Sequence, residues 1–153
     1  MENKYVDVCV DLDETLINSR ESSNPQYETL EKFNIKKSVK KYLPQLYNMR
    51  FRFHVITSRC DYDDTLITVN RIEGVLKFKF SSLTCTGCGE KGIFAKGVGK
   101  YMIDDSLYKL LDCEENDVIP IHYSKSKNIN GIINLKTWKD ISEYLINDNK
   151  ILL

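Results

Sequence analysis

Hydrophobic and polar positions follow one another along the chain in blocks that predict strands and helices in turn. Four short apolar runs indicate buried strands: 5–10, 51–56, 101–103 and 118–121. Apolar residues at helical spacing, or the start signals of helices, predict four helices: 35–48, a segment opening at Asp61, 106–112 and a segment from Thr137. Strands that alternate with helices predict a three-layer α/β fold with a central parallel sheet.

The chain has 153 residues and shows no internal repeat and no low-complexity linker. We therefore expect residues 1–153 to form a single domain, since this length is sufficient for one hydrophobic core. The polar segment NSRESSNPQYE after the first strand indicates a loop or flap.

Composition narrows the class of partner and the compartment. The 22 basic and 22 acidic side chains balance, so no overall field favours nucleic acid or an acidic membrane. The sequence contains no apolar stretch long enough to span a membrane, and its first residues lack the features of a signal peptide. An odd number of cysteines, five, predicts reduced thiols and hence a cytoplasmic location, with the nucleus left open.

Two acidic residues stand directly after the first predicted strand. Strand side chains alternate in direction, so Asp11 and Asp13 point to the same side of the chain. Two neighbouring carboxylates repel each other, which raises a pKa or requires a cation between them. The sequence therefore indicates a charged site at the end of this strand.

The other predicted strands end in polar residues too. Thr-Ser-Arg at 57–59 follows the second strand, and Asp104 and Asp105 follow the third. Three lysines come shortly before the third strand: Lys91, Lys96 and Lys100. Because ligands bind beyond the carboxyl ends of parallel strands, we expect these groups to gather at one edge of the sheet.

These motifs resemble those of the haloacid dehalogenase (HAD) superfamily, over about residues 5–121. The four motifs match as follows: Asp11, Asp13 and Thr15; Thr57; Lys96, with Lys91 and Lys100 as alternatives; and Asp104 with Asp105. The resemblance implies a Rossmann-like fold and a Mg²⁺-dependent phosphatase. It also implies no substantial cap domain, because the intervals 16–51 and 60–101 leave little space for one.

The resemblance assigns catalytic roles to four residues. Asp11 would attack phosphorus and form an aspartyl-phosphate. Asp13 would protonate the leaving oxygen and then activate water, a role that calls for a pKa raised by its neighbour. Thr57 would hydrogen-bond a phosphoryl oxygen, and Lys96 would neutralise the developing charge.

The remaining assignments concern the metal and the substrate. The predicted Mg²⁺ ligands are Asp11, Asp13 through its main-chain carbonyl, Asp104 and Asp105. The predicted substrate-binding residues are Thr15, Ser58, Arg59 and Lys100. An acid at position 13 favours a phosphatase over a dehalogenase, and an open site suits a large substrate.

Two groups within the superfamily are similar to this chain. DLDETL, IDDS and NDVIPI resemble the phosphatases of the C-terminal domain of RNA polymerase II, whereas ITSR, AKGVGKYMIDDS and TWKDI resemble nucleotidases and polynucleotide 3′-phosphatases. The expected substrate is therefore a nucleotide, a nucleic-acid end or a phosphoprotein. The alternative is a catalytically weak regulatory or binding module of the same fold.

Two further features stay open. Cys85 and Cys88, in CTGCG, have the spacing of half a zinc site, but a Gly-rich turn with two incidental thiols is the simpler interpretation. His54 lies inside the second predicted strand, where a packed or hydrogen-bonded imidazole is the simplest expectation.

Overall fold

The computed structural model describes residues 4–19, 33–126 and 131–153. Its main feature is a six-stranded parallel sheet with the order β5-β4-β1-β6-β7-β8. The strands of this sheet are β1 (Val6–Val10), β4 (Phe51–Thr57), β5 (Ser82–Cys85), β6 (Tyr101–Asp104), β7 (Ile119–Tyr123) and β8 (Ile133–Leu135). A separate two-stranded antiparallel pair joins β2 (Ile17–Asn18) to β3 (Asn34–Ile35).

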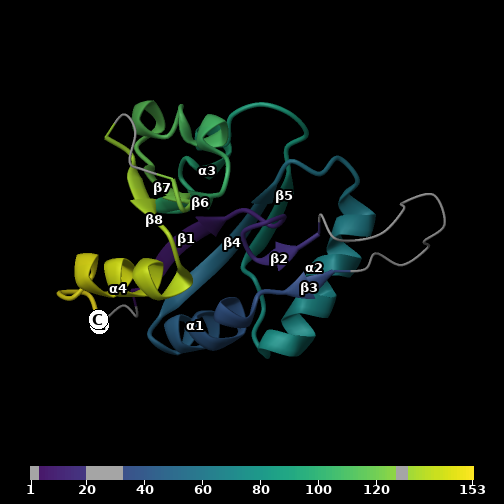
Figure 1. Ribbon diagram of the computed structural model, residues 1–153, viewed down its shortest axis with the longest axis horizontal. Coiled ribbons are helices and arrows are strands. Elements are labelled where there is room, and N and C mark those ends of the chain that lie inside the picture. The colour runs from purple at the N-terminus through teal and green to yellow at the C-terminus, as the bar shows by residue number, and fades with distance from the viewer. Residues whose placement is uncertain (1–3, 20–32, 127–130) are drawn as a thin grey trace.

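Helices cover both faces of the sheet, which confirms the predicted three-layer α/β fold (Figure 1). The α-helices are α1 (Lys37–Asn48), α2 (Tyr62–Leu76), α3 (Gly92–Ala95) and α4 (Trp138–Asp148). Two 3₁₀ helices follow β6, namely η1 (Leu107–Leu110) and η2 (Glu114–Asn116). Helices α1, α2 and α4 pack on one face, and α3, η1 and η2 pack on the other.

The core consists of two apolar clusters separated by the sheet. On the larger side, Val8 and Val10 pack with apolar residues of α1, α2 and α4. On the smaller side, Cys9 packs with Met102 of β6 and Ala95 of α3. Strand β1 is therefore buried on both faces, which explains its nearly unbroken apolar sequence.

Most predicted elements are confirmed, with ends that shift by one or two residues. Asp61 caps α2, because its carboxylate accepts a hydrogen bond from the Asp64 N–H (3.0 Å). The prediction that 118–121 is the last strand is wrong, since β8 follows and pairs with β7. The predicted helix at 106–112 is instead η1 and the turn after it.

No cap domain appears in the part of the chain that the structure describes; only the β2-β3 pair stands there between β1 and α1. Of the predicted flap NSRESSNPQYE, only Asn18 and Ser19 lie within the described residues. No helix in the described ranges is long and apolar enough to cross a membrane.

Candidate active site

A buried ion cluster lies at the carboxyl ends of β1 and β6. The Lys91 Nζ donates to Asp11 Oδ1 and to Asp104 Oδ2, each at 2.7 Å. The Thr15 hydroxyl donates to Asp11 Oδ2 (3.1 Å), and the Ser106 N–H donates to Asp104 Oδ1 (2.9 Å). These contacts hold both carboxylates in fixed orientations.

The position of Lys91 depends on the start of α3. The Asp112 carboxylate accepts hydrogen bonds from the N–H groups of Gly92 (2.6 Å) and Ile93 (2.9 Å). A Cβ at Gly92 would lie 2.7 Å from the Asp112 backbone, so only glycine permits this approach. Asp112, in the turn that follows η1, thereby fixes the start of α3 and the position of Lys91 directly before it.

The structure corrects the choice of lysine. Lys96 follows α3 and is exposed, and the structure does not bring it to the ion cluster. Lys100 lies before β6, at the opposite edge of the sheet, where its N–H donates to Asp7 O and its Nζ donates to Asn149 Oδ1 (3.2 Å). Lys91, which is 1% exposed, takes the predicted place. The substrate-binding prediction for Lys100 is wrong for the same reason.

The last residue of β4 and the two that follow it lie at the same edge of the sheet as this cluster. Thr57 is buried at the end of β4, and its hydroxyl accepts a hydrogen bond from the Arg59 N–H (3.3 Å). Ser58 is half-buried between them. The Arg59 guanidinium pairs with Asp13 through two bonds, from Nε to Oδ2 (2.8 Å) and from Nη2 to Oδ1 (2.6 Å).

The loop between β1 and β2 carries the two aspartates. Hydrogen bonds within the loop and one hydrogen bond from α4 hold its backbone. Leu12 is buried, and its carbonyl accepts hydrogen bonds from the next turn. Glu14 has a φ of 64°, a left-handed conformation uncommon for a residue with a side chain. The Trp138 indole N–H of α4 donates to the Thr15 carbonyl (3.0 Å), across 123 positions of sequence.

Burial and neighbouring charges shift the pKa values of the three residues in the ion cluster. Burial and the neighbouring Asp104 raise the pKa of Asp11 well above its usual value, against the opposing effect of Lys91. Burial also raises the pKa of Asp104, although Lys91 again opposes it. Burial alone would lower the pKa of Lys91, but the charges of Asp11 and Asp104 outweigh it and raise the pKa.

Asp13 departs from the prediction of a raised pKa. Burial would raise its pKa, but hydrogen bonds from Arg59 and Ser19 and the charges of Arg59 and Lys91 together lower it. The prediction was wrong because it considered only the neighbouring acid. Asp13 is held as a carboxylate by a cation 46 residues away in sequence.

The residues fit a divalent metal. Asp11, Asp104 and Asp105 each offer a carboxylate oxygen, and these oxygens lie within 4.8 Å of one another. Oxygen-only ligands are those that Mg²⁺ prefers, and one ammonium cannot balance three acids. The Asp13 carboxylate is turned to Arg59, so its predicted contribution would come from the main-chain carbonyl alone.

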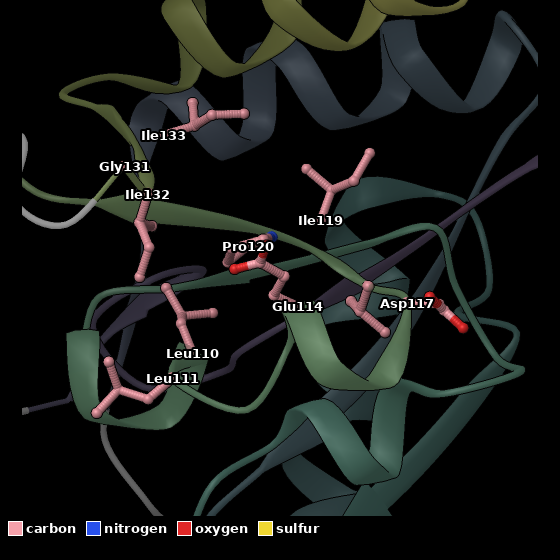
Figure 2. A pocket seen from close by; sticks show the side chains of 10 residues that line it. Leu110, Leu111, Glu114, Asp117, Ile119, Pro120, Gly131, Ile132 and Ile133 are labelled. Atoms are coloured by element: carbon pink, nitrogen blue, oxygen red, sulfur yellow. The ribbon is translucent and has the colours of Figure 1, made fainter.

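Within the described ranges, the metal-capable clusters include no cysteine, so the zinc hypothesis for Cys85 and Cys88 gains no support. A hollow of about 640 Å³ lies between η1, η2 and the starts of β7 and β8. Figure 2 shows the side chains that line it. Its lining includes Leu110, Ile119 and Ile133 and none of the motif residues. The strand-end cluster is therefore the candidate site.

Comparisons with known proteins agree on the fold. No family model matches the sequence, and a search of curated proteins finds no match. Solved structures do match. A HAD-superfamily hydrolase from Ehrlichia chaffeensis has a TM-score of 0.74 at 11% identity, covering 96% of this chain and 98% of that one.

Two other similar structures show the same extent of overlap. An uncharacterized protein from Listeria monocytogenes serotype 4b has a TM-score of 0.70 at 16% identity, over 95% of this chain and 99% of that one. A D,D-heptose 1,7-bisphosphate phosphatase from B. bronchiseptica, complexed with magnesium and phosphate, has a TM-score of 0.69 at 9% identity, over 94% and 99% of the two chains. The chain thus has the fold of HAD-superfamily hydrolases over nearly its whole length.

Proposed function

We propose that the protein is a Mg²⁺-dependent phosphomonoesterase that works through an aspartyl-phosphate on Asp11. The observation that carries this proposal is the buried contact of Lys91 with both Asp11 and Asp104. It places a nucleophilic carboxylate, a fixed cation and a further acid at the end of two neighbouring strands. The match to solved HAD hydrolases and phosphatases supports the same chemistry.

In the first step, a carboxylate oxygen of Asp11 forms a bond to phosphorus while the bond from phosphorus to the leaving oxygen breaks. Asp13, at the rim of the site, gives a proton to that leaving oxygen. Because its pair with Arg59 holds it as a carboxylate in the free protein, Asp13 must take up that proton before or as the substrate binds. Lys91 and the Thr57 hydroxyl stabilise the charge on the other phosphoryl oxygens. The lysine is positioned before substrate arrives, so little reorganisation is needed.

In the second step, Asp13 takes a proton from water, the water oxygen attacks phosphorus, and the bond from phosphorus to Asp11 breaks. Inorganic phosphate leaves and Asp11 is restored. Mg²⁺, held by Asp11, Asp104, Asp105 and the Asp13 carbonyl, would supply further positive charge to the phosphoryl group.

The proposed substrate class rests on the resemblance and on the surroundings of the site. Because no cap domain appears in the described ranges of the chain, we propose a phosphomonoester on a nucleotide, a nucleic-acid end or a phosphoprotein. One similar structure is a heptose bisphosphate phosphatase, so sugar phosphates belong in the same panel. The rates of phosphate release from these substrates would separate the RNA-polymerase-phosphatase-like alternative from the nucleotidase-like one.

The test measures phosphate release from p-nitrophenyl phosphate with Mg²⁺ and with EDTA, for the wild type and for Asp11→Asn. We expect Mg²⁺-dependent turnover that the substitution abolishes, because amide nitrogen is no nucleophile at phosphorus. Equal traces from both proteins would contradict the proposal. They would favour the binding module, which Mg²⁺ titration by calorimetry would then detect.

A further inference from the structure

A second hydrogen-bonded chain of reactive side chains crosses three strands, apart from the candidate active site. The His54 Nε2 lies 2.9 Å from Asp7 Oδ1, and the His54 Nδ1 lies 2.7 Å from Ser82 Oγ. The three residues come from β1, β4 and β5. An acid, an imidazole and a hydroxyl in this order are the parts of a nucleophilic triad.

Strand register brings the three groups together. In the sheet, His54 pairs with Cys9 on one side and with Ser82 on the other. Phe53 and Val55 point into the core under α1 and α2, so His54 points to the opposite face. His54 stands three residues before Thr57, roughly 10 Å along the strand. The three hydrogen-bonded side chains are therefore separate from the candidate phosphoryl site.

The hydrogen bonds determine where the proton of the imidazole lies. A carboxylate only accepts hydrogen bonds, so the His54 Nε2 carries the hydrogen that it shares with Asp7. In the neutral ring, Nδ1 is then the acceptor, and the Ser82 hydroxyl donates to it. The nitrogen that faces Ser82 is thus the one without a hydrogen, as a general base requires. The two ring nitrogens are exchanged relative to the Ser-His-Asp triad, in which Nε2 takes the serine proton.

The three side chains differ in their exposure to solvent. Ser82 is exposed, whereas the His54 side chain is only 13% exposed and the Asp7 side chain is 45% exposed. The Ser81 N–H donates to Phe53 O (2.8 Å). Because successive N–H groups of a strand point to opposite sides, the Ser82 N–H faces the outer side of β5, a terminal strand of the sheet.

We propose that Ser82, activated by His54 and oriented by Asp7, is a second nucleophilic centre that accepts an acyl group from activated esters. The Ser82 oxygen bonds to the carbonyl carbon while its proton passes to the His54 Nδ1. The bond from that carbon to the leaving group then breaks, and His54 returns the proton to the leaving group. The Ser82 N–H is the donor available to the carbonyl oxygen, in the manner of a nucleophile's own amide.

The test uses a fluorophosphonate probe, which reacts with activated serines, followed by peptide mass spectrometry. We expect an adduct on Ser82 that disappears in Ser82→Ala and persists in the matched control Ser81→Ala, since Ser81 is also exposed. His54→Asn should slow labelling by about 100-fold, the usual contribution of a general base. With p-nitrophenyl acetate, the wild type should acetylate the same serine.

The proposal is overturned by the absence of an adduct on Ser82, by equal labelling of Ser81, or by labelling unchanged in His54→Asn. Those results would mean that the three side chains serve only to bridge the strands. Circular dichroism and thermal melting establish that each variant is folded. If His54→Asn does not fold, Asp7→Asn decides, because its half-exposed side chain should be replaceable and labelling should fall by at least about 10-fold.

Discussion

The substitution Lys91→Met tests the site most directly. Methionine keeps the length and flexibility of lysine but removes the ammonium that contacts Asp11 and Asp104 at 2.7 Å each. Both carboxylates are buried, so water cannot replace the lost contacts. The variant leaves two acids side by side without a cation.

The burial of Lys91 determines how much unfolding free energy the substitution removes. Lys91 is 1% exposed, so solvent screening does not reduce its contribution. Removing one partner of a buried pair costs about 3–5 kcal/mol of unfolding free energy, which in a domain of this size lowers Tm by about 10 °C. Loss of the positioned cation should also lower kcat by about 100- to 1000-fold.

The assay compares urea unfolding in EDTA and p-nitrophenyl phosphate turnover in Mg²⁺ for the wild type, Lys91→Met and Lys96→Met. Lys96 is exposed and stands five positions further on, so its substitution removes the same charge without touching the cluster. It should change the unfolding free energy by less than about 0.5 kcal/mol.

Two outcomes would refute the reasoning. If Lys96→Met abolishes turnover and Lys91→Met does not, the lysine predicted from spacing alone is the catalytic one. If Lys91→Met leaves both stability and turnover unchanged, the buried contacts with Asp11 and Asp104 carry no energy.

Three further predictions concern the surroundings of the site. The pKa of Asp13 is lowered in the folded chain. Its pair with Arg59 therefore stabilises the fold above the ordinary carboxyl pKa of about 4, and this stabilisation is lost as the pH falls through the pKa of the folded state. Arg59→Gln should make the unfolding free energy, measured by urea melts at several pH values, fall less steeply toward acid pH, and an unchanged slope would contradict this. Burial raises the pKa of Cys9 and Cys113 to about 12, so iodoacetamide at pH 8 should leave both unmodified while it alkylates exposed thiols, as mass spectrometry of the native protein will show. Gly92→Ala should lower the unfolding free energy by about 1–3 kcal/mol, because its Cβ would meet the Asp112 backbone at 2.7 Å, and a neutral result in thermal melts would mean that this turn can shift.

The sequence predicts which groups gather at the candidate site where a strand leads directly to it. Asp11, Thr57 and Asp104 follow apolar strands, and parallel strands deliver their carboxyl ends to one edge. The rule needs only the positions of strands, which the apolar runs reveal.

Prediction from the sequence failed where the position of a side chain depends on packing between distant segments. Lys91 and Lys96 both precede β6, and only the attachment of α3 to Asp112 determines which of them is buried. A signal was present, because Lys91 directly precedes the apolar run of 92–95. The lowered pKa of Asp13 depends on Arg59, whose proximity no spacing rule predicts.

The short strands at the sheet's two edges were not predicted individually. Strand β8 has three half-buried residues, and β5 has four residues that are half-buried or exposed. Neither shows a clear alternation or a long apolar run, so their pairing with β7 and β4 defines them as strands.

The hydrogen bond from Trp138 to the carbonyl of Thr15 has a consequence for the order of events during synthesis. The loop that carries Asp11 and Asp13 is synthesised well before α4, whose Trp138 bonds to it across 123 positions of sequence. A nascent chain that ends before α4 has both aspartates but lacks this bond to the loop that carries them. We therefore expect the proposed activity to require α4, although all of the candidate site residues precede it.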